Sequence, residues 1–297
     1  MKPVLFEHPY IDSYPVMLAI GFFFAWLTMR IRARQIGLAV SHVDNLGLIA
    51  PLAGLAGGRF FARFFYAKLT FLESLQVWKG EGLIFYGGVL GATTVVLIYA
   101  IIFRLPILKL LDCIAPSLAL GLACGRIGCF LGGCCWGDVC ADPAVAARIQ
   151  DNEARARIQS IPLISPAKFP LAVTFPRESD IYKQHAKWSL ISGAEGRSLP
   201  VHPVQLYESF LAFILTVLLW RAWKRPHRDG DIAIMMLLGY SFVRFFMEFL
   251  RADNRLNDWE LTFSQMTSLW IAAFSLVCLV VRFAVRPTPV GLATAAG

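Results

Sequence analysis

The chain has 297 residues, of which 57% are hydrophobic and only 16% carry a charge. Charged side chains are too few to cover a water-soluble globule of this size, so the composition indicates an integral membrane protein and excludes an ordinary soluble enzyme. The net charge of +8 is accounted for by basic loops on the cytoplasmic side of a membrane, and we expect no nucleic acid partner. Long apolar runs without an alternation of period two predict helical spans.

Seven apolar runs follow one another, of the length that crosses the hydrocarbon of a bilayer. They cover residues 14–29, 46–66, 83–103, 107–131, 204–220, 232–250 and 263–281. Arg30 and Arg34 lie just after the first run, and Arg282 and Arg286 just after the last. Because basic loops stay in the cytoplasm, the N-terminus is expected outside and the C-terminus inside. The sequence therefore predicts an all-α integral membrane protein with about seven transmembrane helices.

The runs divide the chain into four segments. Residues 1–137 hold the first four spans, and residues 138–200 are rich in charges and prolines, which predicts a small soluble insertion on the outer face. Residues 201–286 hold the last three spans. Residues 287–297 are small and weakly polar, and we expect a disordered tail there.

Several ions fall inside these apolar runs, and the topology puts them in one leaflet. Arg126, Arg244 and Glu248 lie in the outer parts of their spans, as do Arg59 and Arg63. A charge at the bilayer centre costs about 2.5–3.5 kcal/mol on insertion scales, so several ions at one depth imply a polar cavity. Guanidinium groups suit two-point contact with phosphate, which points to an anionic phospholipid head group. The alternative is an Arg244–Glu248 pair that only fixes packing.

Tyr240, Arg244 and Glu248 recur every four residues and therefore share one helix face. Glu248 can pair with Arg244 there, and Tyr240 can donate a hydrogen bond to a ligand. Glycines gather in residues 86–91 and 125–137. They allow close approach of a ligand to the backbone or close packing of a neighbouring helix, and both explanations remain open.

Four motifs resemble the prolipoprotein diacylglyceryl transferase family in the same order along the chain. They are Gly125-Arg126-Ile127-Gly128 with Gly137, Phe85-Tyr86-Gly87-Gly88-Val89-Leu90-Gly91, His202-Pro203-Val204-Gln205-Leu206-Tyr207-Glu208, and Gly239-Tyr240 with Arg244, Glu248 and Arg251. Members of that family move the diacylglyceryl group of phosphatidylglycerol to the lipobox cysteine of a preprolipoprotein, making a thioether and releasing glycerol phosphate. The resemblance implies these partners, membrane lipid around the protein, no cofactor, and a place in the bacterial cytoplasmic (inner) membrane.

The resemblance also implies roles for individual residues. Arg126 and Arg244 would grip the phosphate, Glu248 would orient Arg244, and Tyr240 would hydrogen-bond the lipid. The expected catalytic set is Arg126, Arg244, Tyr86 and Glu248. The expected substrate-binding set is Tyr240, Gly87, Gly88, Gly91, Gly137, Asp112, His202, Arg59, Arg63 and Arg251.

Three positions depart from the family pattern. Tyr86 stands where a histidine is usual, Cys129 where an asparagine is usual, and Cys134 where an acidic residue is usual. Tyrosine, with a reference pKa near 10, is a poor base unless nearby arginines lower that pKa. His202 is an alternative base, although a His-Pro at a helix start also has an ordinary structural explanation.

Cysteines cluster at the outer end of the fourth run, at positions 124, 129, 134, 135 and 140. Disulfides among Cys129, Cys134, Cys135 and Cys140 are expected from an oxidising outer compartment, with buried thiols as the alternative. Zinc is the weaker interpretation, since no Cys-x-x-Cys pair or nearby histidine supports it, so we predict no metal site. The departures leave two other functions open. One is a divergent paralogue with thiol-dependent or other lipid-transfer activity, and the other is a non-enzymatic lipid-binding protein.

Overall fold

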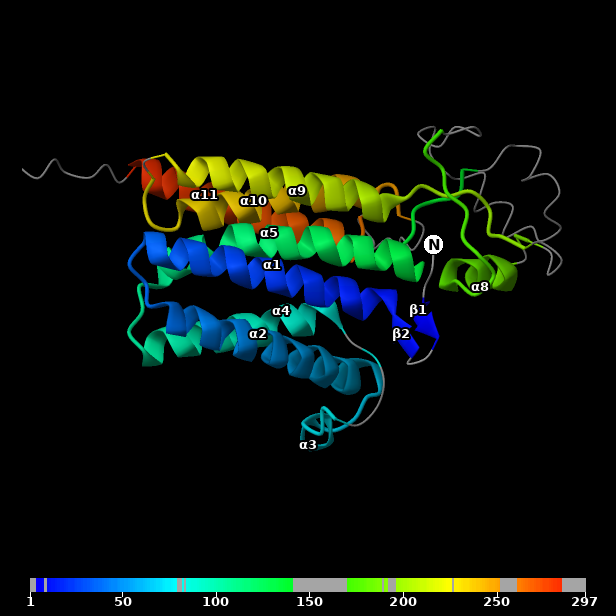
Figure 1. Cartoon of the computed structure of the whole chain (residues 1–297), viewed down its shortest axis with the longest axis horizontal. Helices are drawn as coiled ribbons and strands as arrows, with labels where there is room; N and C mark the ends of the chain where they lie inside the picture. Colours follow the sequence, from blue (N-terminus) through cyan, green and yellow to red (C-terminus); the bar gives the residue numbers. More distant parts are fainter. Residues whose placement is uncertain are drawn as a thin grey trace, which may run out of the picture.

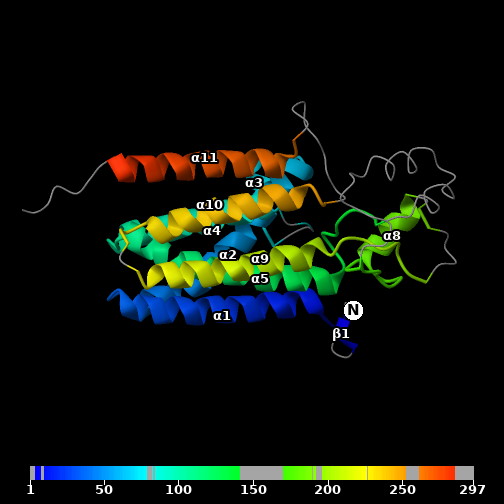
Figure 2. The same ribbon diagram turned by 90° about the horizontal axis from the view of Figure 1, so that it is seen from above.

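The computed structural model describes residues 4–7, 10–78, 82, 84–140, 170–188, 190–191, 196–225, 227–251 and 261–284. Long helices lie side by side and span the length of the molecule (Figure 1; Figure 2). The tail predicted at 287–297 and much of the insertion predicted at 138–200 lie outside the described residues.

The helices follow an antiparallel hairpin of two short strands at the N-terminus. The elements are β1 (Val4–Glu7), β2 (Tyr10–Asp12), α1 (Ser13–Gln35), α2 (Val40–Phe61), the π-helix η1 (Ala62–Tyr66), α3 (Phe71–Ser74), α4 (Phe85–Ile102), α5 (Ile107–Gly132), α8 (Asp180–Lys187), α9 (Val204–Trp223), α10 (Asp231–Glu248) and α11 (Phe263–Ala284). We call the end of the bundle that carries β1, β2 and α8 the α8 end (Figure 1). The opposite end, where α5 begins, is the Asp112 end.

The long helices have the exposure pattern of a protein that faces lipid. Six of them among the described residues are long and apolar enough to cross a membrane: α1, α2 with η1, α4, α5, α9 and α11. Large apolar side chains such as Phe23, Leu52 and Phe213 are exposed, whereas Gln205 and Glu208 are buried. The chain is therefore a multi-pass membrane protein.

The predicted number of spans is not confirmed. Each of the seven predicted runs has a helix in the structure, but α10 is not among the six apolar helices. Its 18 residues include three charges, Asp231, Arg244 and Glu248, whereas α1 and α5 spread three charges over 23 and 26 residues. Its status as a seventh span therefore stays an expectation.

α5 lies at the centre of the bundle, packed between α1 and α9, and it also contacts α10. Ala115 and Ala119 of α5 meet Leu215, Leu219 and Met236 of the neighbouring helices in one buried cluster. Small side chains let helices approach closely where no hydrophobic effect between them helps. As a result, residues on α5, α9 and α10 face one another across short distances.

α2 and α4 form a tighter pair through glycines. A Cβ atom added at Gly57 would lie 2.5 Å from the backbone oxygen of Gly87, and one added at Gly91 would lie 2.5 Å from the backbone oxygen of Ala53. Gly88 faces Gly54 in the same contact. The structure thus gives the glycines of the 86–91 motif the helix-packing explanation.

At the α8 end, the described part of the insertion has a small core of its own. It contains Val139, Phe175, Ile181, Leu190 and Val201. Backbone hydrogen bonds join Val173 to Val201 in both directions, at 3.0 Å each. This layer lies beyond the end of α5 and next to the start of α9 (Figure 2).

Candidate active site

Five charged side chains form one ion-pair chain at the α8 end. The Glu208 carboxylate pairs with Arg126 through Oε2, and its Oε1 lies 2.8 Å from Nη1 of Arg244. Nη2 of Arg244 lies 2.7 Å from Oε2 of Glu248, which in turn lies 3.7 Å from Nε of Arg251. The expected Arg244–Glu248 pair is therefore present, as part of a longer network.

Three helices supply this network, and all of its members are largely buried. Arg126 comes from the last two turns of α5, Glu208 from the second turn of α9, and Arg244 and Glu248 from the end of α10. Glu208 is only 3% exposed. Because buried charges are costly unless they are paired, this alternation of charges allows the arginines to stay between helices.

Glu208 is a candidate site residue that the sequence-based set omits. It accepts a hydrogen bond from Arg244 and forms an ion pair with Arg126, so it is the link between α5 and α10. A signal for it exists in the sequence, since it is a carboxylate inside an apolar run at the depth of Arg126. The rule that intramembrane ions are functional candidates applies to Glu208 as well.

The two tyrosines of the expected site lie on different sides of the network. Tyr240 packs against the buried cluster of α5, α9 and α10, close enough to Arg126 for an electrostatic interaction. The ring of Tyr86 lies edge-on to the ring of Phe263, with centroids 5.2 Å apart. The next residue along α11, Ser264, accepts a hydrogen bond of 3.0 Å from Arg244. Tyr86 is therefore at the same end of the bundle, beside α11.

Gly137 and His202 hold the chain that leaves α5 against α9 and α10. The Gly137 amide donates to the His202 carbonyl at 3.1 Å, and the Asp138 amide donates to the Leu250 carbonyl at 2.9 Å. A Cβ atom at Gly137 would lie 2.5 Å from Cγ2 of Val204. His202 is buried, and burial lowers the pKa of its imidazole, so the ring is neutral at pH 7. Both residues therefore shape the wall of the site through close packing.

Three expected binding residues are not members of the network. Arg59 donates to the Val77 carbonyl at 3.3 Å and Arg63 to the Glu73 carbonyl at 3.0 Å, so both hold the segment around α3. Asp112 lies 14 residues before Arg126 on α5, about 21 Å along the helix. Its two oxygens accept from the amides of Gly230 and Ala233, at 2.6 and 2.8 Å. The structure therefore places Asp112 at the start of α10, at the opposite end of the bundle.

Thiols gather beside Arg126. All seven cysteines are free in the structure, and the Sγ atoms of Cys129, Cys134 and Cys135 lie within 4.8 Å of one another. Cys140 is buried but is not a member of this group. The expected disulfides are not formed, and pairing of these cysteines stays a prediction.

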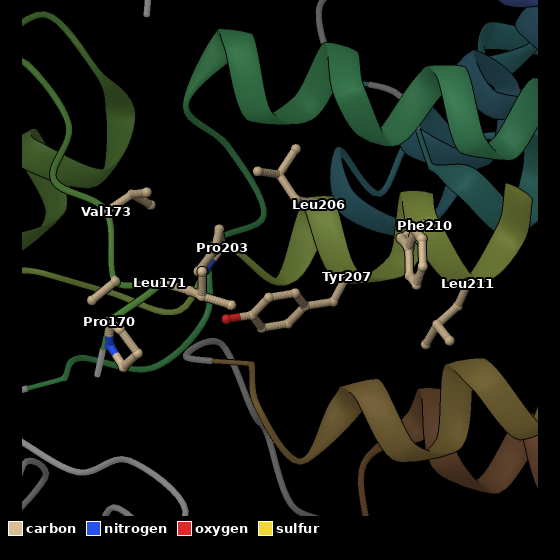
Figure 3. A pocket seen from close by; sticks show the side chains of 9 residues that line it. Pro170, Leu171, Val173, Pro203, Leu206, Tyr207, Phe210 and Leu211 are labelled. Carbon is tan, nitrogen blue, oxygen red and sulfur yellow. The ribbon is translucent and has the colours of Figure 1, made fainter. Parts of the chain in front are cut away.

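Two apolar cavities flank the ends of α9. One of about 620 Å³ lies at the start of α9, where the Tyr207 ring points toward Leu171 and Pro203 and Phe210 also lines the wall (Figure 3). The other, of about 600 Å³, is enclosed by α9, α10 and α11, with Phe242, Phe245 and Leu269 in its wall. Both have the character of spaces for hydrocarbon, and neither includes the ion-pair network.

Comparison with known proteins identifies the family to which this chain belongs. The sequence profile of the prolipoprotein diacylglyceryl transferase family matches residues 3–281. The chain belongs to this family. Among individual proteins, the phosphatidylglycerol–prolipoprotein diacylglyceryl transferase of Clostridium tetani is 29% identical over 275 residues, which cover 91% of this chain and 93% of the relative.

Relatives of the same name occur in other bacteria. The protein of Cronobacter sakazakii is 31% identical over 274 residues, covering 89% of this chain and 81% of the relative. That of Bordetella parapertussis is 30% identical over 252 residues, covering 82% and 79%. Within this transferase family, the present chain combines the arginine network with three clustered thiols. The family resemblance inferred from the four sequence motifs is confirmed.

Proposed function

We propose that this protein transfers the diacylglyceryl group of phosphatidylglycerol to the lipobox cysteine thiol of a prolipoprotein. The observation that carries the proposal is the ion-pair network at the α8 end, in which three arginines share two carboxylates. Three positive and two negative charges leave one positive charge, which complements the single negative charge of a phosphodiester. The names of the relatives support the same two substrates.

Arg126 and Arg244 are the proposed contacts to the phosphate. Glu208 takes the Nε edge of Arg126 and the Nη1 group of Arg244. This arrangement fixes both guanidinium groups and leaves terminal N–H groups of Arg126 to face a further anion, as far as the described residues show. Guanidinium groups that are already ordered lose little entropy when they bind the phosphate.

The proposed reaction exchanges one bond at carbon. The acceptor sulfur attacks the glycerol carbon that bears the phosphodiester, so that a carbon–sulfur bond forms and the carbon–oxygen bond breaks. Glycerol phosphate leaves with the electron pair, and the thiol proton is lost. Because negative charge grows on the phosphate oxygens as the bond breaks, fixed positive charges aimed at them lower the barrier.

The surrounding groups fit supporting roles. Glu248 would orient Arg244 through their 2.7 Å contact, and Tyr240, packed against the cluster of α5, α9 and α10, would hydrogen-bond the lipid. The cavity between α9, α10 and α11 is apolar and suits acyl chains. We place α10 as the seventh span of a protein in the bacterial inner membrane, with its N-terminus outside, its C-terminus inside and the network in the outer leaflet.

The replacement of the usual histidine by Tyr86 affects one step of the mechanism, the deprotonation of the acceptor thiol. A free thiol with a pKa near 8.5 is a few per cent thiolate at neutral pH, so deprotonation at pH 7 costs only about 2 kcal/mol. Tyr86 occupies the position of the usual histidine, and His202 is neutral and can accept a proton. Either residue would serve as the base in the transferase reaction.

The full-length protein in vesicles that contain labelled phosphatidylglycerol tests the proposal. A lipobox peptide should gain the mass of one diacylglyceryl group. Arg126→Ala and Arg244→Ala should each lower the rate by about 10²–10³, the usual cost of losing one transition-state contact. Arg221→Ala, an exposed arginine at the Asp112 end of α9, is the matched control and should keep the wild-type rate.

Two results would contradict the proposal. One is the absence of any peptide product with folded wild-type protein, and the other is a full rate in both arginine variants. Saturable binding of phosphatidylglycerol without transfer would instead identify a lipid-binding protein.

A further inference from the structure

Cys129 and Cys134 are brought together by the way α5 ends. Gly133 adopts a left-handed conformation with φ 72° and ends the helix. The Cys134 amide donates to the Cys129 carbonyl at 3.1 Å, and the Gly133 amide donates to the Phe130 carbonyl at 3.3 Å. These two bonds define a Schellman motif, in which the side chains of the residues corresponding to Cys129 and Cys134 touch. In most proteins this contact is hydrophobic, whereas here it joins two thiols.

A third thiol turns toward this pair at a backbone cost. Cys135 has φ 57°, in the left-handed region that residues with a Cβ avoid. Such a conformation is unfavourable and persists only where the surrounding structure stabilises it. Gln205 on α9 supplies part of that hold, because its Nε2 donates to the Cys134 carbonyl at 2.7 Å. The strained backbone thus directs a third sulfur to within 4.8 Å of the other two.

Three convergent sulfurs suit a metal ion better than a disulfide. A disulfide would use only two of the three sulfurs and leave the third unpaired. A tetrahedral zinc ion with Zn–S bonds of about 2.3 Å needs sulfurs about 3.8 Å apart. Sulfurs that already lie within 4.8 Å need only small side-chain movements to reach that spacing. No Cys-x-x-Cys pair is required, because the helix end supplies the proximity.

Two positive charges lie beside these sulfurs. Arg251 and Arg126 are both close enough to Cys135 to interact electrostatically with its sulfur. Thiolate is the form that binds metal. A cation held by three thiolates carries net negative charge, and the two arginines lie beside it to balance that charge.

We propose that Cys129, Cys134 and Cys135 bind a thiophilic divalent cation of the zinc type through three thiolates, with a fourth position that takes the acceptor thiol. The second half of this proposal rests on the proposed transferase function. Three protein ligands with one open position are the arrangement of catalytic zinc sites. The arrangement would supply the thiol activation that Tyr86, in place of the usual histidine, supplies poorly.

The chemistry needs no oxidant. As the acceptor sulfur binds the cation, its S–H bond breaks and the proton passes to water, because a coordinated thiol is deprotonated. The bound sulfur then attacks the glycerol carbon, and the leaving phosphate stays near Arg126. The product thioether is neutral and a weaker ligand than thiolate, so it can leave the cation.

Metal binding is measured first, without any transfer reaction. Reduced full-length protein in detergent is titrated with Zn²⁺ against a chromophoric chelator, and Co²⁺ then serves as a spectroscopic probe. We expect one ion per chain, with thiolate-to-cobalt charge-transfer bands and visible bands of tetrahedral cobalt. Cys134→Ser and Cys135→Ser should each weaken binding by about 100-fold or more. Cys124→Ser and Cys140→Ser, outside the cluster, are matched controls and should bind like the wild type.

A second experiment, with the acceptor peptide, tests the open coordination position. A lipobox peptide should increase the charge-transfer absorption of the cobalt protein, and the same peptide with serine in place of cysteine should not. Weak binding unaffected by Cys134→Ser or Cys135→Ser, in proteins with wild-type circular dichroism, would overturn the proposal. The proposal would also be overturned if the cobalt spectrum did not change on addition of the cysteine peptide. Undiminished transfer after complete metal removal would overturn it as well. That last result would leave the proposed transferase function standing, whereas a positive cobalt result without transfer would refute only the function.

Discussion

The two ends of the bundle hold buried charges in opposite ways, although the same helices supply them. At the α8 end, Glu208 lies between Arg126 of α5 and Arg244 of α10. At the Asp112 end a carboxylate also meets α10, but this one comes from α5, and Asp112 accepts from the backbone amides of Gly230 and Ala233. One carboxylate has arginine partners, and the other has the first turn of a helix.

This difference separates the proposed ligand site from a structural contact. The first amides of a helix have no partner within the helix, so a carboxylate placed there completes the hydrogen bonding and stabilises the helix dipole. Asp112 is therefore satisfied within the protein. In the Arg126–Glu208–Arg244–Glu248–Arg251 network the positive charges outnumber the negative ones, so the network retains capacity for an anion.

A buried arginine at the Asp112 end makes the same point. The Arg32 guanidinium of α1 lies 4.5 Å from the ring centroid of Trp220 and 4.4 Å from that of Trp223. Its partners are indole faces, which attract a cation without presenting an opening for a phosphate. Burial of an arginine alone therefore does not mark the reactive end, and the identity of its partners does.

The largest expected effect comes from removing the carboxylate at the α8 end. Glu208→Gln leaves two buried arginines without their shared counter-charge, and breaking a buried pair in this way costs about 3–5 kcal/mol. We expect a clear drop in Tm and a loss of at least about 100-fold in transfer rate. Thermal unfolding in detergent and the labelled-lipid assay measure the two effects. The exposed Glu178→Gln is the control, and a variant as stable and active as that control would remove Glu208 from the site.

The second largest effect is expected from lowering the pH, which should destabilise the layer that covers the α8 end. His185 is 0% exposed, and burial lowers its pKa to about 4 from the usual 6.5. The unfolded state therefore takes up a proton that the folded state does not, so stability is lost as the pH falls from 6.5 toward 4. The full difference is about 3 kcal/mol.

Hydrogen exchange of the amides in residues 175–188, corrected for the intrinsic rate, measures this loosening. Exchange should accelerate below pH 6.5 in the wild type and change much less in His185→Gln. Equal pH dependence in the two proteins would show that His185 is not the responsible group.

A smaller effect is expected from filling the close contact at Gly137. In Gly137→Ala the added Cβ meets Val204, the His202 carbonyl and the Leu250 carbonyl at 2.5, 2.7 and 2.7 Å. Two of these neighbours are backbone and cannot rotate away, so we expect a loss of about 1–3 kcal/mol. Gly125→Ala, where an added Cβ meets nothing within 4 Å, is the stability control. Matching Tm values for the two variants would contradict the packing role of Gly137.

The smallest effect is expected at the Asp112 end. Asp112→Asn keeps one acceptor oxygen and loses the other, so α10 should lose a cap worth about 1 kcal/mol while the transfer rate stays within about twofold. Thermal unfolding measures the loss of stability in Asp112→Asn, and the transfer assay measures its rate. Abolished transfer at an unchanged Tm would put Asp112 in the path of the substrate, as the family resemblance implied, and the contrast between the two ends would fail.

Hydropathy alone located the long helices well. The run predicted at 107–131 is α5, Ile107–Gly132, and the run predicted at 263–281 is α11, Phe263–Ala284. The length and apolarity of such a segment are sums over neighbouring residues, so the chain displays them directly. The spacing of Arg244 and Glu248 predicted their pair for the same reason, since residues four apart on a helix must be neighbours.

The partners that charged side chains find on other segments could be identified only from the tertiary structure. The sequence put Arg59 and Arg63 in one set with Arg126, yet they bind carbonyls near α3, and it put Asp112 in the binding set, yet Asp112 caps α10. Neither outcome follows from the depth of a residue in the membrane or from its type. Both depend on which backbone groups of other segments lie near the side chain in the folded protein.

The cysteine cluster depends on both the local sequence and the tertiary structure. Their number and spacing were visible in the sequence, and Gly133 encodes locally the turn that joins Cys129 to Cys134. The sequence by itself thus determined a membrane bundle with arginines and thiols near one end of its fourth span. Only the tertiary structure decided that Glu208 links those arginines and that Cys135 completes a group of three sulfurs, because both depend on the packing of α9 against the end of α5.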